Sequence, residues 1–198
     1  MRKKICKVMI LGDSGVGKTS ILEQYVNRIF TGKYKVTIGA DFLTKDLTIN
    51  EEKIMLQIWD TAGQEKYRGL SLAYYRGSEA CVLVYDITNK ASFTSLNSWM
   101  ETFFGQVPES QLDNFPLVIV GNKIDKEGRE VTLEVARKWT QLHNNATLVE
   151  VSAKTGIGID TVFNHIGDLL ANKYNGPAKI KGQKIISDLK PRDKGCCE

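Results

Sequence analysis

Residues 12–20 read G-D-S-G-V-G-K-T-S and fit the pattern G-x-x-x-x-G-K-[ST] at every fixed position. Gly12, Gly15 and Gly17 allow the backbone to curl where a Cβ would clash, so that successive N–H groups can converge on anionic oxygens. Lys18 adds a positive charge. The run therefore predicts a loop that binds the phosphates of a nucleotide, and an ordinary glycine-rich turn is the alternative.

The surrounding pattern favours the phosphate loop. An apolar, strand-like run, Ile5 to Leu11, comes before it, and a helical pattern with Ile21, Leu22, Tyr25 and Val26 on one face follows. A helix N-terminus carries unpaired N–H groups and partial positive charge, which suit a bound phosphate.

Charge is unevenly distributed along the 198 residues. The segment from Asn172 to Glu198 contains seven of the 27 Lys and Arg and three of the 23 Asp and Glu, so the remainder is balanced. A neutral body with a basic tail argues against nucleic-acid binding and favours contact with an anionic membrane surface. We expect one domain over residues 1–172 and a flexible basic tail over residues 173–198, which has no apolar period.

The N-terminal basic residues do not predict a signal peptide, because Lys7 interrupts the apolar run that follows them. No stretch approaches the length of a membrane-spanning helix. Cys6 and Cys81 fall in apolar runs, while Cys196 and Cys197 lie next to the last residue. This spacing fits neither a metal site nor a disulfide framework, so we expect a reducing, cytosolic setting.

After the first helix, Ile29 to Asp41 predicts a loop that is long for a connector and lies beside the phosphate site. Phe42 to Ile49 and Lys53 to Asp60 then predict a hairpin. Strand alternation places Phe42 and Trp59 on its polar side. We expect an exposed aromatic patch that binds partners; the alternative is that these rings fold under a neighbouring loop.

Strands and helices alternate from Ala80 onward, which predicts an α/β fold, and the phosphate-loop pattern at residues 12–20 indicates that this fold is of the P-loop NTPase type. We expect a six-stranded, mostly parallel sheet with one antiparallel edge strand and helices on both faces. The histidines, His143 and His165, are interpreted as structural or solvated. The later strands and the apolar positions of the later helices are predicted as follows: strands Cys81–Tyr85, Leu117–Val120 and Thr147–Val151; helix positions Phe93, Leu96, Met100, Phe103 and Val107, then Val135, Ala136, Trp139 and Leu142, then Ile159, Val162, Phe163, Ile166, Leu169 and Leu170.

Asp60 begins D-T-A-G-Q at the end of the third strand, where its carboxylate can orient Mg²⁺ directly or through water. Thr19 offers a hydroxyl to the same ion. Gly63 can bring an N–H to a γ-phosphate, and the amide of Gln64 can orient an attacking water, which makes Gln64 the candidate catalytic residue. A solvated loop residue is the alternative for Gln64.

The run N-K-I-D, Asn122 to Asp125, follows the strand Leu117 to Val120 and predicts guanine recognition. Asp125 can accept hydrogen bonds from N1–H and the 2-amino group of guanine, whereas adenine presents no such donor pair. The stem of Lys123 can cover the base and Asn122 can tie the loop back. Ser152 to Lys154, S-A-K, lies where a backbone N–H can meet guanine O6.

These motifs, in this order, resemble the Ras-like small GTPases over residues 4 to 172. Within that family, T-I-G-A-D-F from Thr37, L-Q-I-W-D-T-A-G-Q-E from Leu56 and Y-Y-R-G from Tyr74 are similar to the Rab branch. The run Y-K-V-T-I-G-A-D-F-L-T-K and the later N-F-P-L-V-I-V-G-N-K-I-D are most similar to late-endosomal and vacuolar Rabs. The sequence departs from common Rab patterns at Lys66-Tyr67 and at Ser78-Glu79. These differences leave the catalytic residues unchanged and bear on which partner proteins the chain binds.

The resemblance implies that Thr37 binds Mg²⁺ and the γ-phosphate in the GTP state, that Tyr34 closes over the phosphates and that Phe30 packs against guanine. It implies an effector-binding triad of Phe42, Trp59 and Tyr74, and two switch segments, 30–41 and 61–77, that GTP orders. The expected metal ligands are Thr19, Thr37 and Asp60. The expected nucleotide-binding residues are Ser14, Gly15, Val16, Gly17, Lys18, Thr19, Ser20, Phe30, Tyr34, Thr37, Gly63, Asn122, Lys123, Asp125, Ser152, Ala153 and Lys154.

The Cys-Cys-Glu ending resembles the prenylation sites of Rabs, with Cys196 and Cys197 as the lipidated residues, while an unmodified thiol pair is the alternative. The resemblance further implies a monomer that cycles between cytosol and the cytoplasmic face of endosomal, lysosomal or vacuolar membranes. The implied partners are effectors, an exchange factor, a GTPase-activating protein, a GDP-dissociation inhibitor and a prenylation escort.

We therefore expect a Mg²⁺-dependent GTPase that recruits effectors to these membranes in its GTP state and regulates vesicle trafficking. No internal arginine finger is evident, so we expect slow intrinsic turnover. A non-hydrolysing GTP-bound scaffold is the alternative, and Gln64 argues against it. A small-molecule phosphotransferase is a third interpretation, in which N-K-I-D would have no purpose.

Overall fold

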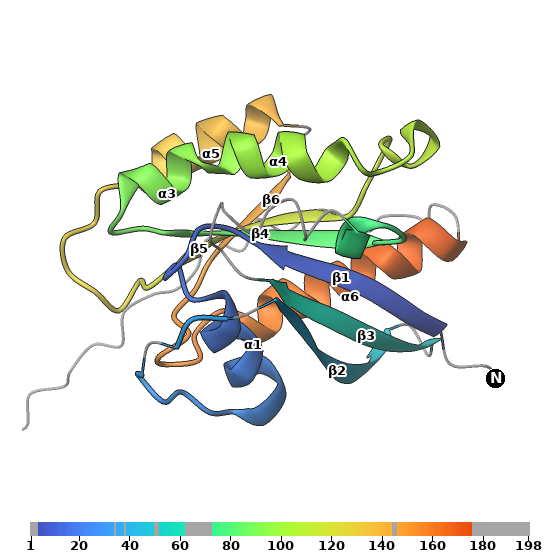
Figure 1. The fold of residues 1–198 in the computed structure, drawn as a ribbon, viewed down its shortest axis with the longest axis horizontal. Helices are drawn as coiled ribbons and strands as arrows, with labels where there is room; N and C mark the ends of the chain where they lie inside the picture. Colours follow the sequence, from blue (N-terminus) through green and yellow to red (C-terminus); the bar gives the residue numbers. More distant parts are fainter. Residues whose placement is uncertain are drawn as a thin grey trace, which may run out of the picture.

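A twisted six-stranded sheet forms the centre of the computed structural model, which describes residues 4–33, 35–37, 39–49, 52–61, 73–143 and 146–175 (Figure 1). The strand order is β2-β3-β1-β4-β5-β6. Only the β2–β3 pair is antiparallel among the pairs of this sheet, as the sequence predicts. The strands are β1 (Lys4–Leu11), β2 (Ala40–Ile49), β3 (Glu52–Thr61), β4 (Ala80–Asp86), β5 (Leu117–Asn122) and β6 (Thr147–Glu150).

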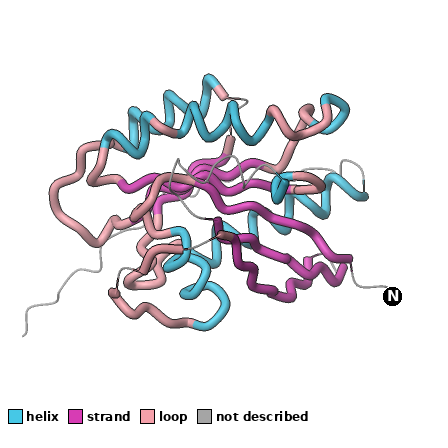
Figure 2. Tube along the Cα trace, viewed as in Figure 1, coloured by secondary structure: helices cyan, strands magenta, loops and turns pink. Residues whose placement is uncertain are grey.

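Helices cover both faces of the sheet (Figures 1 and 2). Helices α1 and α6 lie on one face, and α3, α4 and α5 lie on the other. The described helices are α1 (Lys18–Asn27), α3 (Lys90–Thr94), α4 (Leu96–Phe104), α5 (Leu133–Leu142) and α6 (Ile159–Asn175), with a short 3₁₀ turn at Glu109–Gln111. The predicted α/β architecture with helices on both faces is confirmed.

Alternation along the strands divides the buried side chains into two cores. In β1, Cys6, Val8 and Ile10 face α1 and α6, whereas Met9 and Leu11 face the opposite helices. The central strand β4 is buried along its whole length, which explains why its sequence is a continuous apolar run rather than an alternating one.

The hairpin pairs Phe42 with Trp59 across β2 and β3. Leu47 and Ile49 pack against the core beneath α1 and α6, so the residues of opposite parity point outward. Phe42 is 43% exposed, and Trp59 is half-buried. The aromatic side of the hairpin is therefore exposed at Phe42 rather than folded under a loop.

Helix α5 carries its apolar residues differently from an ordinary core-facing helix. Ala136 is fully buried, but Val135 and Leu142 are 50% and 82% exposed. The buried residues of α5 are Ala136 and Thr140, and Trp139 packs against the core beside them, so the apolar positions Val135 and Leu142 lie outside the buried face of the helix.

Helix α6 continues to Asn175, beyond the expected domain limit at residue 172. Its last turn is fixed to the sheet, because the Tyr174 hydroxyl donates to Glu79 Oε1 and lies 3.6 Å from Cys6 Sγ. Lys4 lies over the Tyr174 ring. The tail that follows residue 175 lies outside the described residues.

The two histidines take part in local packing. His165 Nε2 lies 2.6 Å from Thr147 Oγ1, and burial lowers the pKa of His165. His143 stacks on Trp139. None of the helices within the described ranges is long and apolar enough to span a bilayer.

Candidate nucleotide-binding site

The phosphate loop connects the end of β1 to the start of α1, at the carboxyl edge of the sheet where ligands bind in such folds. Two of its glycines are required by close contacts. Gly12 has a φ of 141°, and a Cβ there would lie 2.2 Å from the carbonyl oxygen of Val84. Gly17 has a φ of 100°, and its Cβ would lie 2.4 Å from Asn122 Nδ2. Side chains are thus excluded where the loop passes β4 and β5.

Lys18 is almost completely buried and its ammonium is held by the loop itself. Nζ donates to the carbonyl oxygens of Gly12 at 2.8 Å and Asp13 at 2.9 Å. Burial lowers the pKa of Lys18 to about 8, against the attraction of Asp60 and Asp13. The first N–H groups of α1 are not capped by a side chain at Gly17, so they are available to an anion.

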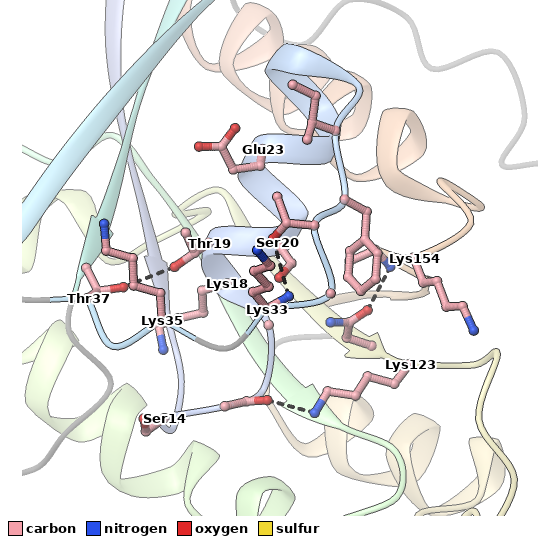
Figure 3. Close-up of a pocket in the computed structure, with 18 of the residues that line it drawn as sticks. Ser14, Lys18, Thr19, Ser20, Glu23, Lys33, Lys35, Thr37, Lys123 and Lys154 are labelled. Atoms are coloured by element: carbon pink, nitrogen blue, oxygen red, sulfur yellow. Dashed lines mark hydrogen bonds between the residues drawn. The ribbon is translucent and has the colours of Figure 1, made fainter.

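Three oxygen-bearing side chains converge beside Lys18. Thr19 Oγ1 donates to Asp60 Oδ2, and Thr37 Oγ1 donates to the same oxygen at 3.4 Å. The Thr19 and Thr37 hydroxyls are 3.1 Å apart (Figure 3). The structure therefore brings α1, β3 and the loop before β2 together at one point.

Asp60 fits a cation at this point. Asp60 is 3% exposed, and burial raises the pKa of its carboxyl group. No group among the described residues hydrogen-bonds to its buried Oδ1. A buried carboxylate oxygen that has no donor within the described part of the chain, next to two hydroxyls, matches the hard oxygen ligands that Mg²⁺ takes, directly or through water.

The opposite end of the site is tied together by Asn122, at the end of β5. Its Nδ2 donates to the carbonyl oxygen of Val16 at 2.8 Å, and its Oδ1 accepts from the backbone N–H of Ala153 at 3.1 Å. One buried amide thus joins the phosphate loop to the segment after β6.

Asp125 is oriented by the S-A-K segment. Ser152 Oγ donates to Asp125 Oδ1 at 2.6 Å and accepts from the N–H of Thr155 at 3.1 Å. Lys123 has a φ of 73°, and its Nζ donates to the carbonyl oxygen of Gly15 at 2.7 Å (Figure 3). A carboxylate and a lysine stem therefore flank the place that the sequence assigns to the base.

These parts surround a cavity of about 760 Å³. Lys33, Lys35 and Lys126, which are not among the predicted nucleotide-binding residues, also line it. Val16, Asp60 and Ser152 are buried behind its surface. Tyr34, Gly63 and Gln64 lie outside the described residues, as do Cys196 and Cys197. The expected site residues that line the cavity are Ser14, Gly15, Gly17, Lys18, Thr19, Ser20, Phe30, Thr37, Asn122, Lys123, Asp125, Ala153 and Lys154.

An aromatic cluster lies next to this site. The ring centroids of Phe42 and Trp59 are 5.1 Å apart, and those of Trp59 and Tyr74 are 5.7 Å apart. Tyr74 is 37% exposed and belongs to a helical turn at residues 73–75. Lys7 lies over the Trp59 ring. The three rings form one continuous, partly exposed surface, as the resemblance implies.

A strand–phosphate loop–helix unit, a hydroxyl and carboxylate cluster and an Asn-Lys-x-Asp segment around one cavity define the guanine-nucleotide class of P-loop proteins. The Ras family model matches residues 7–172, and the chain belongs to this family. Proteins of this family are GTPases, and so is this chain.

Its relatives are Rab proteins. The chain is 50% identical over 200 residues to the Ras-related protein Rab7 of Pisum sativum, covering 98% of this chain and 97% of that protein. It is 48% identical over 165 residues to Rab7 of Drosophila melanogaster, covering 83% and 80%. It is 44% identical over 202 residues to Rab-7a of Dictyostelium discoideum, covering 99% and 98%. The similarity to the Rab branch, inferred from its motifs, is confirmed, and the chain is a Rab-type GTP-binding switch.

Two residues that hold the site belong to none of the sequence motifs. Asp86 is ion-paired to Lys123, with 2.6 Å between Oδ2 and Nζ. Trp99, on α4, donates to Asp13. Asp86 could have been predicted from the sequence as a site residue, since it is a carboxylate that ends an apolar strand at the ligand-binding edge of the sheet. Trp99 could not, because it lies within an apolar helical pattern.

Proposed function

We propose that the cavity binds GTP and GDP together with Mg²⁺. The residues around it hydrolyse GTP and couple the bound nucleotide to the binding of partner proteins. The observation that carries the proposal is the convergence of Thr19, Thr37 and Asp60 beside Lys18. These groups come from segments far apart in the sequence. A carboxylate, two hydroxyls and an ammonium in one place have the chemistry that a triphosphate and its cation require.

The chain's own residues bind and orient the nucleotide. The N–H groups of the phosphate loop and of the start of α1 donate to phosphate oxygens. Lys18 turns from the carbonyl oxygens of Gly12 and Asp13 to the phosphates, where its charge is better neutralised. Asp125 selects guanine, since an adenine would leave its carboxylate without donors.

Thr19, Thr37 and Asp60 are the residues that would hold Mg²⁺, which neutralises charge on the β- and γ-oxygens when bound. Gln64 orients the attacking water through its amide. This role is assigned from the sequence, since Gln64 lies outside the described residues. An arginine supplied by an activating protein accelerates hydrolysis by about 10³- to 10⁵-fold.

Thr37 couples the nucleotide to partner binding. It lies three residues before β2, the strand that carries Phe42 in the aromatic cluster. Loss of the γ-phosphate releases Thr37, and effectors that contact Phe42, Trp59 and Tyr74 then dissociate. An exchange factor replaces GDP by GTP.

The proposed place of action is the cytoplasmic face of late endosomal, lysosomal or vacuolar membranes, where the protein regulates vesicle traffic as a monomer. Similarity to proteins named Rab7 supports this proposal. Prenyl groups on Cys196 and Cys197 would supply the anchor, attached by an escort protein and shielded in the cytosol by a GDP-dissociation inhibitor.

Single-turnover GTP hydrolysis by the purified protein with Mg²⁺, together with GTP and ATP affinities, tests the proposal. We expect slow hydrolysis and a strong preference for GTP. Gln64→Leu should bind GTP normally and hydrolyse it at least about tenfold more slowly. Unchanged hydrolysis in this variant would contradict the role of Gln64, and tight GTP binding without turnover, even with an activating protein, would favour the scaffold.

A further inference from the structure

Asp86 is the last residue of β4 and does not belong to any of the nucleotide-binding motifs. It is 7% exposed, and its Oδ2 lies 2.6 Å from the ammonium of Lys123. We propose that Asp86 is a positioning residue of the nucleotide site, which holds Lys123 so that its stem covers the base while its ammonium stays on the phosphate loop. The inference rests on the proposed guanine-nucleotide site and adds a residue to it.

The carboxylate of Asp86 is itself held in place. Its Oδ1 accepts from the backbone N–H of Thr88 at 2.9 Å and from Thr88 Oγ1 at 2.7 Å. The N–H of Asp86 donates to Ser92 Oγ at 3.0 Å, which fixes the backbone at the end of the strand. Oδ2 is therefore directed at Lys123 by contacts that do not involve the cavity.

The charge of Asp86 is maintained in spite of its burial. Burial alone would raise the pKa of this carboxyl, but the hydrogen bonds from Lys123 and Thr88 outweigh it and hold the pKa below its ordinary value. The carboxylate is thus ionised at neutral pH and attracts the ammonium of Lys123.

A lysine stem has four rotatable bonds, and ordering it over a ligand costs side-chain entropy. The contacts of Lys123 offset this cost before a ligand arrives. Its ammonium meets both Asp86 and the carbonyl oxygen of Gly15, so three segments are joined at one nitrogen. Asn122 joins the base segment to the phosphate loop a second time, at Val16.

A purely local role for Asp86 makes a different prediction. Its contacts with Thr88 also stabilise the turn after β4, and loss of that turn would lower stability whatever residue stood at position 123. A positioning role instead requires the ammonium of Lys123. The two roles are separated by measuring the effect of one substitution with and without that ammonium.

The experiment measures release of a fluorescent GDP analogue from the full chain with Mg²⁺. Asp86→Asn keeps the volume and an acceptor for Thr88, but it turns an amide N–H₂ toward the ammonium. We expect release about tenfold faster than from wild type, the effect of losing one charged hydrogen bond. Glu150→Gln is the matched control, since it removes a 2.6 Å ion pair with Arg129 outside the cavity lining, and release should not change.

The decisive comparison repeats Asp86→Asn in a Lys123→Met background, which keeps the apolar stem and removes the ammonium. There the substitution should not accelerate release further, because it acts through the ammonium. Equal acceleration in both backgrounds, or none in the wild-type background, would overturn the inference.

Thr88→Val is a milder variant in case Asp86→Asn fails to fold. It keeps the side-chain volume, removes the hydroxyl that orients Asp86, and should accelerate release about two- to threefold. No acceleration would count against the inference. A wild-type protein that does not bind GDP would overturn the proposed function as well, whereas normal GDP binding with unchanged release from both variants would overturn the inference alone.

Discussion

The indole N–H of Trp99 donates a 2.8 Å hydrogen bond to Oδ1 of Asp13, 86 positions earlier in the chain. Trp99 is 1% exposed and is the largest of the fully buried side chains among the described residues. Asp13 is in the phosphate loop, and its carbonyl oxygen accepts from Lys18. The core beneath α4 therefore holds one side of the loop in place.

Replacing Trp99 with phenylalanine should weaken GDP binding about three- to tenfold, because Asp13 loses a buried donor while most of the apolar volume remains. Titration with a fluorescent nucleotide measures the change. Trp139→Phe is the control, since it removes a comparable 3.1 Å indole hydrogen bond, to Asn97, away from the cavity. Equal affinities for Trp99→Phe and wild type would show that the hydrogen bond does not support the loop.

Nucleotide affinity should fall with rising pH because of Lys18. Burial lowers its pKa to about 8 in the nucleotide-free protein, and the phosphates bind the protonated form. Below about pH 8 the proton is already present, and above it binding must take up a proton. From about pH 7 to about pH 8.5 the affinity for GDP should fall about fourfold by this linkage. In Lys18→Met the affinity for GDP should be low at every pH and should not change with pH over this range. A pH dependence that persists in this variant would be caused by another group.

Asp125→Asn should change which base is bound without altering the phosphate contacts. An amide offers one acceptor and one donor, so it meets guanine's two donors with a mismatch and suits xanthine, which presents one donor and one oxygen. GTP affinity should fall at least about 100-fold and xanthosine triphosphate should bind more tightly than GTP. Competition binding with the two nucleotides measures this, and an unchanged preference for GTP would contradict the role of Asp125.

Asp60→Asn should make nucleotide retention independent of Mg²⁺. In wild type, chelation of the metal should accelerate GDP release at least about tenfold, since the cation that Thr19 and Asp60 would hold no longer neutralises the charge of the phosphates. An amide in place of the carboxylate binds a divalent cation weakly, so chelation should have little further effect on this variant. A wild-type release rate that does not respond to chelation would count against the metal site.

The sequence predicts the parts of this protein whose signals are local. Spacing within one segment predicts the glycines and lysine of the phosphate loop. Alternation along the hairpin strands likewise predicts that Phe42 and Trp59 lie on the same side of the hairpin. The mostly parallel sheet with one antiparallel edge strand also follows, because the sequence shows a hairpin and then alternating strands and helices.

Contacts between distant segments could not be predicted in the same way. The Trp99 indole lies on an apolar helical pattern that gives no indication of a polar partner, and Tyr174 lies in the segment that the sequence predicts to be a tail. Leu142 belongs to such a pattern and is nevertheless 82% exposed, because the face of α5 that meets the sheet is set by tertiary packing rather than by periodicity.

The attachment of Tyr174 to Glu79 and Cys6 has a mechanical consequence. Cys6 lies near the start of β1 and Glu79 directly precedes β4, at the edge of the sheet remote from the cavity, and the chain continues from Tyr174 into its tail. A force applied through a lipidated tail would enter the sheet at this end. There, the pairing of β1 with β3 and β4 distributes the load over many backbone hydrogen bonds. Tension on the proposed lipid anchor should therefore leave the retention of nucleotide at the opposite edge unaffected.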